Sequence, residues 1–289
     1  MTTMTAPDLD LRPDATVALR SPRGPVAMPR LGFGVFEVPD AMACEVVSEA
    51  LCVGYRSIDT ATIYRNEVGV GDALARSDVP RSEIFLTTKV WNDAQGYDKV
   101  MRSYEDSLSR LRQEYVDLLL LHWPCPAKGL YVESWRALLD LARSGAVRAV
   151  GVCNFNPEHL QRLIDETGVA PSINQVELHP YLTQRRLRAF QDGHGVVTEA
   201  WGPLGRGGAL LFDGTIRAIA DEVGRTPAQV ILRWHLQHGR VAIPKSVTPS
   251  RIAQNFAVFD VELTPTQMAR LDGLDRGRRT GPDPDMFGN

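Results

Sequence analysis

GYRSIDTATIYRNE, at residues 54–67, contains a short run typical of a buried strand, and this run ends at the acid Asp59. The phenol of Tyr64 follows five positions later. The same arrangement returns further along the chain, where Lys89 closes IFLTTK and His122 closes VDLLLLH. Mostly apolar runs of this length are typical of strands that are buried on both faces of a parallel sheet. The sequence therefore predicts a parallel sheet whose strands end, one after another, on ionisable side chains.

Strands and helices alternate along the rest of the chain. Strands are expected before Asp59 and at residues 31–35, 84–89, 116–122, 147–152, 173–176, 196–200 and 241–243. Helices are expected between them, and Pro157, Pro227 and Pro265 each follow a capping Asn or Thr. Helices at 216–223, before the last strand, and at 265–274, at the C-terminus, are additional to the simple alternation.

This alternation favours one closed barrel of about eight strand–helix units. No composition break or linker divides the 289 residues, so a single (β/α)8 TIM barrel domain over 1–289 is expected. A turn at 21–24 between extended pieces predicts an N-terminal β-hairpin, and residues 1–14 are expected to form a disordered lead. A doubly wound sheet in two domains is the alternative architecture.

The overall composition excludes several classes of function. The net charge is -3, so neither nucleic acid nor an anionic membrane is an expected partner. No apolar stretch approaches the ~20 residues of a membrane span, and the first residues lack the basic start and apolar core of a signal peptide. The four cysteines show no CxxC spacing, and no metal site is expected. We expect a cytoplasmic monomer.

The four ionisable residues at strand ends define a candidate proton-delivery site. A tyrosine acts as a general acid near neutral pH when a nearby cation lowers its pKa from the free value of about 10. Lys89 is expected to supply that charge to Tyr64, and Asp59 is expected to keep the lysine ionised. His122 is expected to orient the phenol or to share its proton. Each residue alone is more commonly structural, and their conjunction carries the functional interpretation.

Other strand ends carry groups that suit a carboxamide, an aromatic ring and a pyrophosphate. Asn154 and Gln175 have amides that donate and accept hydrogen bonds, as a carboxamide such as nicotinamide requires. Trp201 offers a flat face on which an aromatic ring can stack. The residues after it, 203–205, read Pro-Leu-Gly and allow a pyrophosphate to approach the backbone closely.

The last strand end suits a terminal phosphate. Lys245 and Ser246 stand before the helix that carries Arg251, so two cations, a hydroxyl and a helix N-terminus converge. The alternative interpretation is an ordinary solvated loop. It is disfavoured because Lys245 follows a strand end, as the other candidate site residues do. The sequence GVG at 69–71 begins like a dinucleotide-binding fingerprint, but Leu74 takes the place of the third glycine.

Seven motifs in sequence order make the chain resemble the aldo-keto reductases over residues 17–286. They are GYRSIDTATIYRNEVGVGDAL, LTTKVWN, VDLLLLHWP, GVCNF, NQVELHP, EAWGPLG and IPKSVTPSRIAQNF. TEAWGPLG and the short tail look most like the small bacterial members that include 2,5-diketo-D-gluconate reductase. The resemblance implies a barrel that binds NADPH without a Rossmann fold. It also implies a catalytic tetrad, in which Tyr64 is the acid, formed by Asp59, Tyr64, Lys89 and His122.

The resemblance assigns roles to the remaining residues as well. Asn154 and Gln175 would hold the carboxamide, Trp201 would stack on the nicotinamide, and the adenine would lie near Asn255. The 2′-phosphate would bind Lys245, Ser246 and Arg251. The full set of cofactor contacts would be Cys153, Asn154, Gln175, Trp201, Gly202, Pro203, Leu204, Gly205, Lys245, Ser246, Val247, Arg251 and Asn255. The substrate pocket would be lined by Phe36, Trp91 and Trp123.

Two positions depart from the family pattern. Cys153 stands where the motif GVSNF has serine, and a thiol is a weaker hydrogen-bond donor than a hydroxyl. The carboxamide contact is therefore the one that this departure affects. Ser57 stands where the motif GYRHIDTA has histidine, and it is expected to lie behind the strand, away from the site.

The resemblance implies NADPH-dependent reduction of a small carbonyl compound, an aldehyde, an α-dicarbonyl or a keto-sugar acid, to the alcohol. The fold also serves channel-associated subunits and lens proteins, so a catalytically silent barrel acting as an NADPH-binding regulatory or structural subunit is the main alternative. A barrel isomerase or aldolase would use Lys89 as a Schiff-base nucleophile. That third class leaves Lys245 and Arg251 unexplained.

Overall fold

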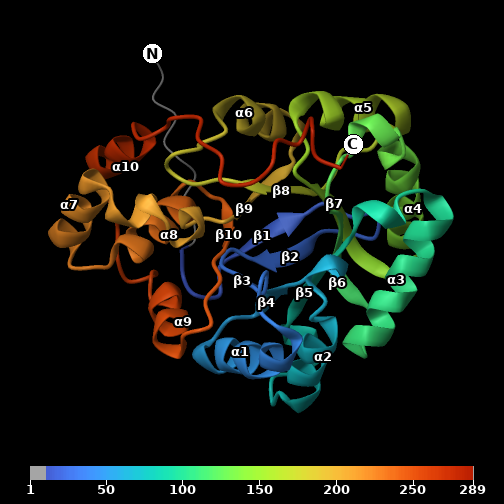
Figure 1. Cartoon of the computed structure of the whole chain (residues 1–289), viewed down its shortest axis with the longest axis horizontal. Helices are drawn as coiled ribbons and strands as arrows, with labels where there is room; N and C mark the ends of the chain where they lie inside the picture. The colour runs from blue at the N-terminus through green and yellow to red at the C-terminus, as the bar shows by residue number, and fades with distance from the viewer. Residues whose placement is uncertain (1–10, 289) are drawn as a thin grey trace.

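The barrel expected from the sequence is the fold of the chain. A computed structural model describes residues 11–288, and Figure 1 shows a ring of strands with helices around it. The sheet order runs from β10 to β3 without a crossover, and neighbouring strands pair in parallel. The strands are β3 (Phe33–Gly34), β4 (Ser57–Asp59), β5 (Phe85–Val90), β6 (Val116–Leu121), β7 (Val147–Cys153), β8 (Ile173–Glu177), β9 (Val197–Trp201) and β10 (Val241–Ile243).

Helices cover the outside of the sheet. They are α1 (Asp40–Val53), α2 (Glu67–Arg76), α3 (Tyr97–Leu111), α4 (Tyr131–Ser144), α5 (Pro157–Thr167), α6 (Arg185–His194), α7 (Gly214–Val223), α8 (Pro227–Gln237), α9 (Pro249–Phe256) and α10 (Pro265–Asp272). Three helices begin where the sequence predicts, because Asn156, Thr226 and Thr264 each form a capping box. The expected extra helices are α7, before the last strand, and α10, near the C-terminus.

Hydrogen bonds between the first and last strand segments close the barrel. The backbone N–H of Gly32 donates to the carbonyl of Ala242 at 2.9 Å, and the N–H of Ala242 donates to the carbonyl of Arg30 at 3.0 Å. Leu31 forms an isolated parallel bridge with Ala242. Because this bridge takes over part of the pairing, the regular strand β3 is shorter than the 31–35 expected from the sequence.

The expected N-terminal hairpin closes one end of the barrel. It consists of the antiparallel strands β1 (Thr16–Leu19) and β2 (Val26–Pro29). Leu19 and Met28 are buried and belong to the same apolar cluster as Phe85, which begins β5. The hairpin therefore packs at the N-terminal ends of the barrel strands and leaves their C-terminal ends for the site. In Figure 1 it lies at the centre of the ring of strands.

Two apolar cores lie on opposite faces of the sheet. Side chains alternate along each strand, so every second residue points into the barrel and the others point towards the helices. The interior core includes Phe85, Leu118 and Leu120, and a larger core lies between the sheet and the helices. Ser57 corrects one expectation. It is buried on the same face of β4 as Asp59, inside the barrel rather than behind the strand, because residues two apart share a face.

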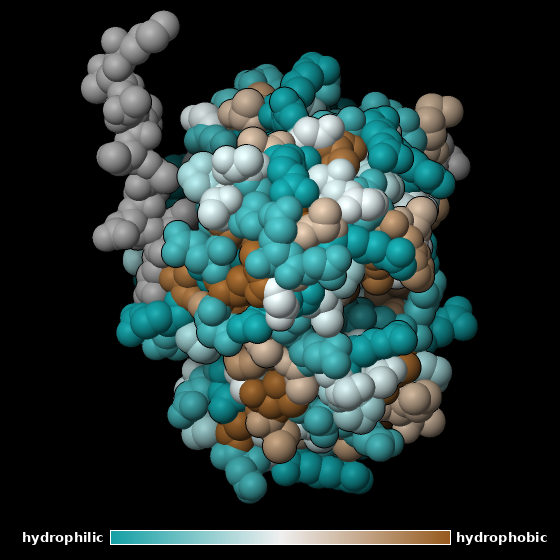
Figure 2. All heavy atoms as spheres, turned by 90° about the vertical axis from the view of Figure 1, so that its left-hand side faces the viewer, coloured by the Kyte–Doolittle hydropathy of each residue, from teal (hydrophilic) through white to brown (hydrophobic). Residues whose placement is uncertain are grey.

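The two ends of the described chain lie outside the regular barrel elements. Residues 1–10, and with them most of the expected lead, lie outside the described residues; 11–14 contain a turn before β1. After α10 the chain crosses the barrel mouth towards α5 (Figure 1). Figure 2 shows the face with α7 and α10, where hydrophobic side chains form small separate groups among hydrophilic ones.

Two features that bear on function are absent from residues 11–288. None of the helices there has the length and apolar character needed to cross a membrane. Within the same range, the His, Cys, Asp and Glu side chains form no group of three or more that could hold a metal ion.

Candidate active site

A cavity of about 1220 Å³ lies at the C-terminal ends of the barrel strands. Nearly all the residues assigned to catalysis, cofactor and substrate line it together. They are Phe36, Asp59, Tyr64, Trp91, His122, Trp123, Cys153, Asn154, Gln175, Trp201, Gly202, Pro203, Leu204, Lys245, Ser246, Val247, Arg251 and Asn255. Lys89 and Gly205 are buried and do not form part of the cavity wall. The structure thus gathers side chains from distant parts of the sequence into one site.

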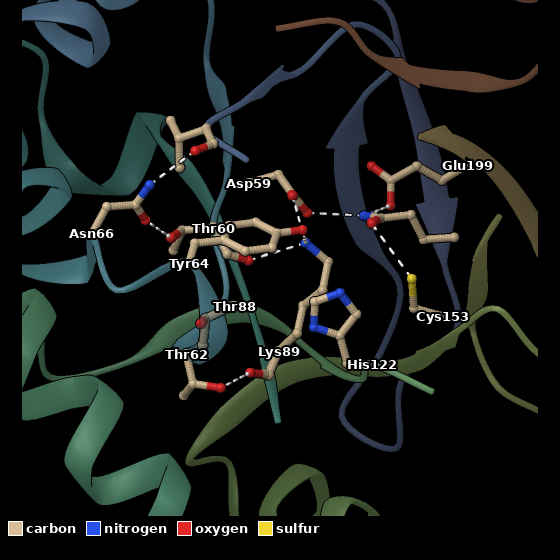
Figure 3. A network of polar contacts seen from close by, with 12 residues as sticks. Asp59, Thr60, Thr62, Tyr64, Asn66, Thr88, Lys89, His122, Cys153 and Glu199 are labelled. Carbon is tan, nitrogen blue, oxygen red and sulfur yellow. Dashed lines mark hydrogen bonds and ion pairs between the residues drawn. The ribbon is translucent and has the colours of Figure 1, made fainter. Parts of the chain in front are cut away.

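Lys89 is the centre of the polar network in the barrel (Figure 3). Its ammonium nitrogen lies 2.5 Å from Asp59 Oδ1 and donates to the carbonyl of Thr60 at 3.0 Å. It also donates to the hydroxyl of Tyr64 at 3.4 Å. The ring of His122 lies edge-on to the Tyr64 ring, with centroids 5.7 Å apart. The four residues of the expected tetrad are therefore brought together around one buried cation.

Local hydrogen bonds hold the tyrosine in place. Tyr64 ends a short 3₁₀ helix, Thr62–Tyr64, in the loop after β4. The Thr62 hydroxyl donates to the backbone carbonyl of Lys89 at 2.8 Å, which fixes this loop to β5. Asn66 is buried and its amide donates to the carbonyl of Val35 at 2.8 Å, which fixes the loop to the segment after β3. The phenol is thereby directed at the lysine, as Figure 3 shows.

The environment of the tetrad sets its protonation states. Burial raises the pKa of Tyr64, and Lys89 opposes this rise only in part, so the phenol stays protonated at neutral pH. Lys89 acts on the tyrosine pKa in the expected direction, but the cost of removing a phenolate from water outweighs the attraction of one ammonium, so the pKa lies above and not below its free value. Burial alone lowers the pKa of Lys89, but Asp59 and Tyr64 together raise it above its ordinary value. Burial, and then Lys89, lower the pKa of His122, so its imidazole is neutral.

The two expected amides are already hydrogen bonded within the protein. Gln175 Nε2 donates to Asp59 Oδ2 at 2.8 Å and to Glu199 Oε2 at 2.9 Å. Asn154 Oδ1 accepts a hydrogen bond from the indole nitrogen of Trp201 at 2.7 Å. Both amides therefore donate or accept within the protein. The amino group of Gln175 is fully occupied, whereas its carbonyl oxygen accepts only from the Cys153 thiol, at 3.6 Å, and keeps a lone pair for a ligand.

Cys153 lies between these two amides. Its Sγ is 3.6 Å from Gln175 Oε1, to which it donates, and it accepts from Asn154 Nδ2 at 3.1 Å. The side chain is buried and lines the cavity. Burial raises the pKa of the thiol well above its ordinary value, with Lys89 opposing, so the sulfur is a neutral thiol.

The opposite end of the cavity carries free positive charge. Lys245 and Arg251 are exposed, and neither side chain has a hydrogen bond or ion pair among residues 11–288. Ser246 is buried between them in sequence, and its Oγ accepts from the backbone N–H of Thr248 at 3.1 Å. Thr248 and Gln254 also line this end, and sequence reasoning missed both. Both residues lie within the motif IPKSVTPSRIAQNF, and that position is the sequence signal by which they could have been found.

An ion pair joins two loops at the cavity wall. Arg206, after β9, lies 2.6 Å from the carboxylate of Glu37, after β3, and its guanidinium is 5.5 Å from the ring centre of Phe36. Both charged residues line the cavity. They are 169 positions apart in the sequence, so no local pattern indicates this pair.

The C-terminal tail, which the sequence indicated only as a loop, also lines the cavity through Gly281, Pro282 and Phe287. The carboxylate of Glu177 accepts hydrogen bonds from the backbone N–H groups of Thr280 and Gly281, at 2.5 and 3.0 Å. A Cβ on Gly281 would lie 2.5 Å from the indole of Trp201, so only glycine fits there. Burial opposes ionisation of Glu177, but its hydrogen bonds prevail and lower its pKa to about 2. The side chain that holds the tail is therefore an anion.

Phe287 brings the tail onto the expected substrate pocket. Its ring centroid lies 4.5 Å from that of Trp123 and 6.2 Å from that of Trp91. The cavity lining therefore includes a side chain from the C-terminal tail. The sequence indicated a loop in this region and assigned no role to Phe287.

The fold and site have counterparts in known proteins. The aldo/keto reductase family model matches residues 30–276. The methylglyoxal reductase DkgA of Salmonella typhimurium is 52% identical over 262 residues, which are 90% of this chain and 94% of DkgA. The crystal structure of a Gox0644 mutant in complex with NADPH has a TM-score of 0.88 and 49% identity, covering 94% of this chain and 98% of that one. An aldo-keto reductase of Bombyx mori in complex with NADP has a TM-score of 0.85 and 32% identity, covering 93% and 96%.

The barrel, the cavity at its strand ends and the buried Asp–Lys–Tyr contact define one class of oxidoreductase. The chain belongs to the aldo/keto reductase family. The resemblance drawn from the seven sequence motifs is thereby confirmed.

Proposed function

We propose that this protein reduces a small carbonyl compound to the alcohol, with NADPH as the hydride donor and Tyr64 as the general acid. The observation that carries the proposal is the 3.4 Å contact between the Tyr64 hydroxyl and the buried Lys89 ammonium, beside a cavity of about 1220 Å³. The proposed substrate is an aldehyde, an α-dicarbonyl or a keto-sugar acid. Methylglyoxal is an α-dicarbonyl, so the name of the relative DkgA favours that class.

The residues of the cavity fit NADPH. The cavity is larger than the roughly 300–1,000 Å³ of ordinary ligand pockets, as a cofactor and a substrate bound together require. Lys245 and Arg251 would hold a terminal phosphate, since both cations lack partners among the described residues and flank the start of α9. Gln175 and Asn154 would hold the carboxamide at the other end, beside the indole of Trp201. Bound there, NADPH supplies a hydride to the carbonyl carbon.

Tyr64 supplies the proton in this proposal. Its hydroxyl is protonated at neutral pH, and it gives the proton to the carbonyl oxygen as negative charge develops there. The Lys89 ammonium stabilises the phenolate that remains, and Asp59 keeps Lys89 charged. His122 is neutral and lines the cavity beside Tyr64, where it can orient the carbonyl or the phenol.

The two alternative classes are weaker on specific grounds. A silent NADPH-binding subunit has no need of a tyrosine in contact with a buried lysine, yet Tyr64 and Lys89 are in contact at 3.4 Å. A Schiff-base enzyme needs a neutral amine, whereas the environment raises the pKa of Lys89 and pairs it with Asp59. Lys89 is also absent from the cavity wall, so a substrate carbonyl does not reach it.

A panel of carbonyl compounds tests the proposal. Purified protein is incubated with NADPH and, in turn, aldehydes, α-dicarbonyls and keto-sugar acids, while the absorbance of NADPH is followed. We expect its oxidation with at least one class. NADPH binding without oxidation across the whole panel would favour the silent subunit. Trapping of a substrate on the protein by borohydride would favour the Schiff-base enzyme.

Cys153→Ser is expected to tighten NADPH binding about two- to tenfold. A hydroxyl is a better donor than a thiol, and the net value of a neutral hydrogen bond is about 0.5–1.5 kcal/mol. Cys153 is in place for this role, since its sulfur lies between Gln175 and Asn154 on the cavity wall. Turnover rises less, or falls if cofactor release limits it. The measurement is a fluorescence titration with NADPH, and unchanged or weaker binding would show that Cys153 is only a small packed hydrophobe.

Phe287→Ala is expected to raise KM for the carbonyl substrate about three- to tenfold, with little change in NADPH affinity. The substitution removes ring contacts with Trp91 and Trp123 in the substrate pocket but leaves the phosphate end of the cavity intact. Met286→Ala is the matched control, because Met286 is 72% exposed and does not line the cavity. Equal KM values for both variants and wild type would remove the tail from the substrate pocket.

A further inference from the structure

Glu199 is a fully buried carboxylic acid inside the barrel that the proposed chemistry does not use. It lies on β9, directly opposite Gln175 on β8, and both are less than 2% exposed. Its Oε2 accepts a hydrogen bond from Gln175 Nε2 at 2.9 Å, and its Oε1 has no partner among the described residues. Burying a carboxylic acid costs free energy unless hydrogen bonds compensate for the lost water. Glu199 makes one such bond, to Gln175, and this contact calls for an explanation.

The contact fixes which way the Gln175 amide faces. Both hydrogens of its amino group are used, one on Asp59 Oδ2 at 2.8 Å and one on Glu199 Oε2 at 2.9 Å. Rotating the amide by half a turn would place its carbonyl oxygen against the Asp59 carboxylate, which has no proton to donate, and would take the amino group away from both acceptors. Asp59 therefore disfavours the rotated amide, and Glu199 supplies a second acceptor that the amino group reaches only in the observed orientation.

We propose that Glu199 is a positioning residue for the cofactor. Together with Asp59 it holds the amino group of Gln175, so that Gln175 presents only its carbonyl oxygen to the carboxamide end of the cavity. The ligand group bound there must then offer an N–H donor, as a primary carboxamide does. This inference rests on the proposed function, because it deepens the binding of NADPH at that same site.

The charge balance of the barrel is consistent with this role. Burial, and then Asp59, raise the pKa of Glu199 to about 8, while Gln175 and Lys89 oppose the rise. Asp59, Lys89 and Cys153 are the titratable groups that face it. At pH 7 Glu199 is mainly protonated, and its carbonyl oxygen still accepts from Gln175. The single negative charge left beside Lys89 is then that of Asp59.

Two substitutions of Glu199 separate positioning from packing. Glu199→Leu fills a similar volume but offers no acceptor, so one amino hydrogen of Gln175 is left buried without a partner. We expect NADPH to bind about tenfold more weakly, because the amide loses its fixed orientation. Glu199→Gln is the isostere of the protonated acid and keeps a carbonyl oxygen for Gln175. We expect it to rescue binding to within about threefold of wild type at pH 7.

A double-mutant cycle shows whether Glu199 acts through Gln175. NADPH affinity is measured by fluorescence titration for wild type, Glu199→Leu, Gln175→Met and the double variant. If the two residues act as one unit, Glu199→Leu has no further effect once Gln175 is replaced. Thr198→Val is the matched control. Thr198 lies next along β9, its hydroxyl accepts from Gln191, and it does not line the cavity.

The outcomes are distinct. Wild-type affinity in Glu199→Leu, or equal losses in Glu199→Leu and Glu199→Gln, would overturn the positioning role. Losses that add in the double variant would do the same. Circular dichroism and thermal unfolding of each variant without cofactor establish that it is folded, and Glu199→Gln keeps the test informative if the leucine variant is not. Failure of the proposed function has a different signature, because wild-type protein would then not bind NADPH or not oxidise it with any carbonyl.

Discussion

Replacing Tyr64 by phenylalanine is expected to lower kcat for carbonyl reduction by about 10²–10⁴-fold and to leave NADPH binding nearly unchanged. The substitution removes the one acidic proton that a buried cation contacts in the cavity. The loss belongs in kcat, because the proton moves only as negative charge develops on the substrate oxygen in the transition state. Single-wavelength NADPH kinetics and a parallel fluorescence titration measure the two quantities.

The Tyr64→Phe protein is expected to fold normally. The phenylalanine ring keeps the packing against Phe36, whose centroid lies 5.0 Å away. Lys89 keeps Asp59 and the carbonyl of Thr60 as partners, at 2.5 and 3.0 Å, so its charge is not left alone in the barrel. The chemical loss is therefore separable from a loss of structure.

Tyr97→Phe is the matched control for this experiment. The Tyr97 hydroxyl also contacts one ionisable side chain, Asp140, at 3.0 Å, but it lies outside the cavity. We expect this variant to retain wild-type turnover. If Tyr64→Phe also turned over within a few-fold of wild type, Tyr64 would not be the general acid.

Wild-type protein is expected to prefer NADPH over NADH by at least tenfold, and Lys245→Ala together with Arg251→Ala is expected to erase most of that preference. The two cofactors differ in the 2′-phosphate, for which Lys245, Ser246 and Arg251 are the proposed partners. Hydrogen bonds to charged groups are worth about 1.5–3 kcal/mol each, so one such contact from Lys245 or Arg251 is enough for the tenfold preference expected of wild type. The measurement is the Kd of each cofactor for wild type and the double variant.

Ionic strength gives an independent check of the same assignment. Exposed charges are screened by salt, so the NADPH affinity of wild type should fall as salt is added, and that of the double variant should fall less. Arg162→Ala together with Arg186→Ala controls for the loss of two positive charges, since these residues pair with Glu166 and Glu158 and neither lines the cavity. Equal Kd values of wild type for NADPH and NADH would contradict the phosphate site.

The order of the elements was readable from local sequence. Mostly apolar runs such as residues 116–122 predict strands buried on both faces, and capping residues such as Thr226 mark helix starts, because both signals depend on neighbours in the chain. The eight strands and the extra helices α7 and α10 followed from these signals. The ends of the strands were predicted less accurately than their order. β3 is shorter than expected because its pairing partner, Ala242, lies at the other end of the sequence.

The site could be assembled from the sequence because a parallel barrel brings successive strand ends to one rim. Asp59, Lys89 and His122 were indicated by that register alone, whereas the roles of Phe36 and Trp91 required the resemblance to a family. The contacts between these residues, and their effects on pKa values, could not be predicted from the sequence. It indicated that Lys89 and Tyr64 lie near one another, but not that burial would outweigh the lysine and raise the tyrosine pKa.

The sequence by itself determined the fold, the strand-end residues and the family of this protein, because each is written in local patterns of side chains. Only the tertiary structure decided that Glu199 faces Gln175, that Arg206 reaches Glu37, and that Phe287 packs against Trp123. These contacts join positions far apart along the chain, and their strength depends on burial. Burial is a property of the packed barrel as a whole, and no short stretch of sequence contains it.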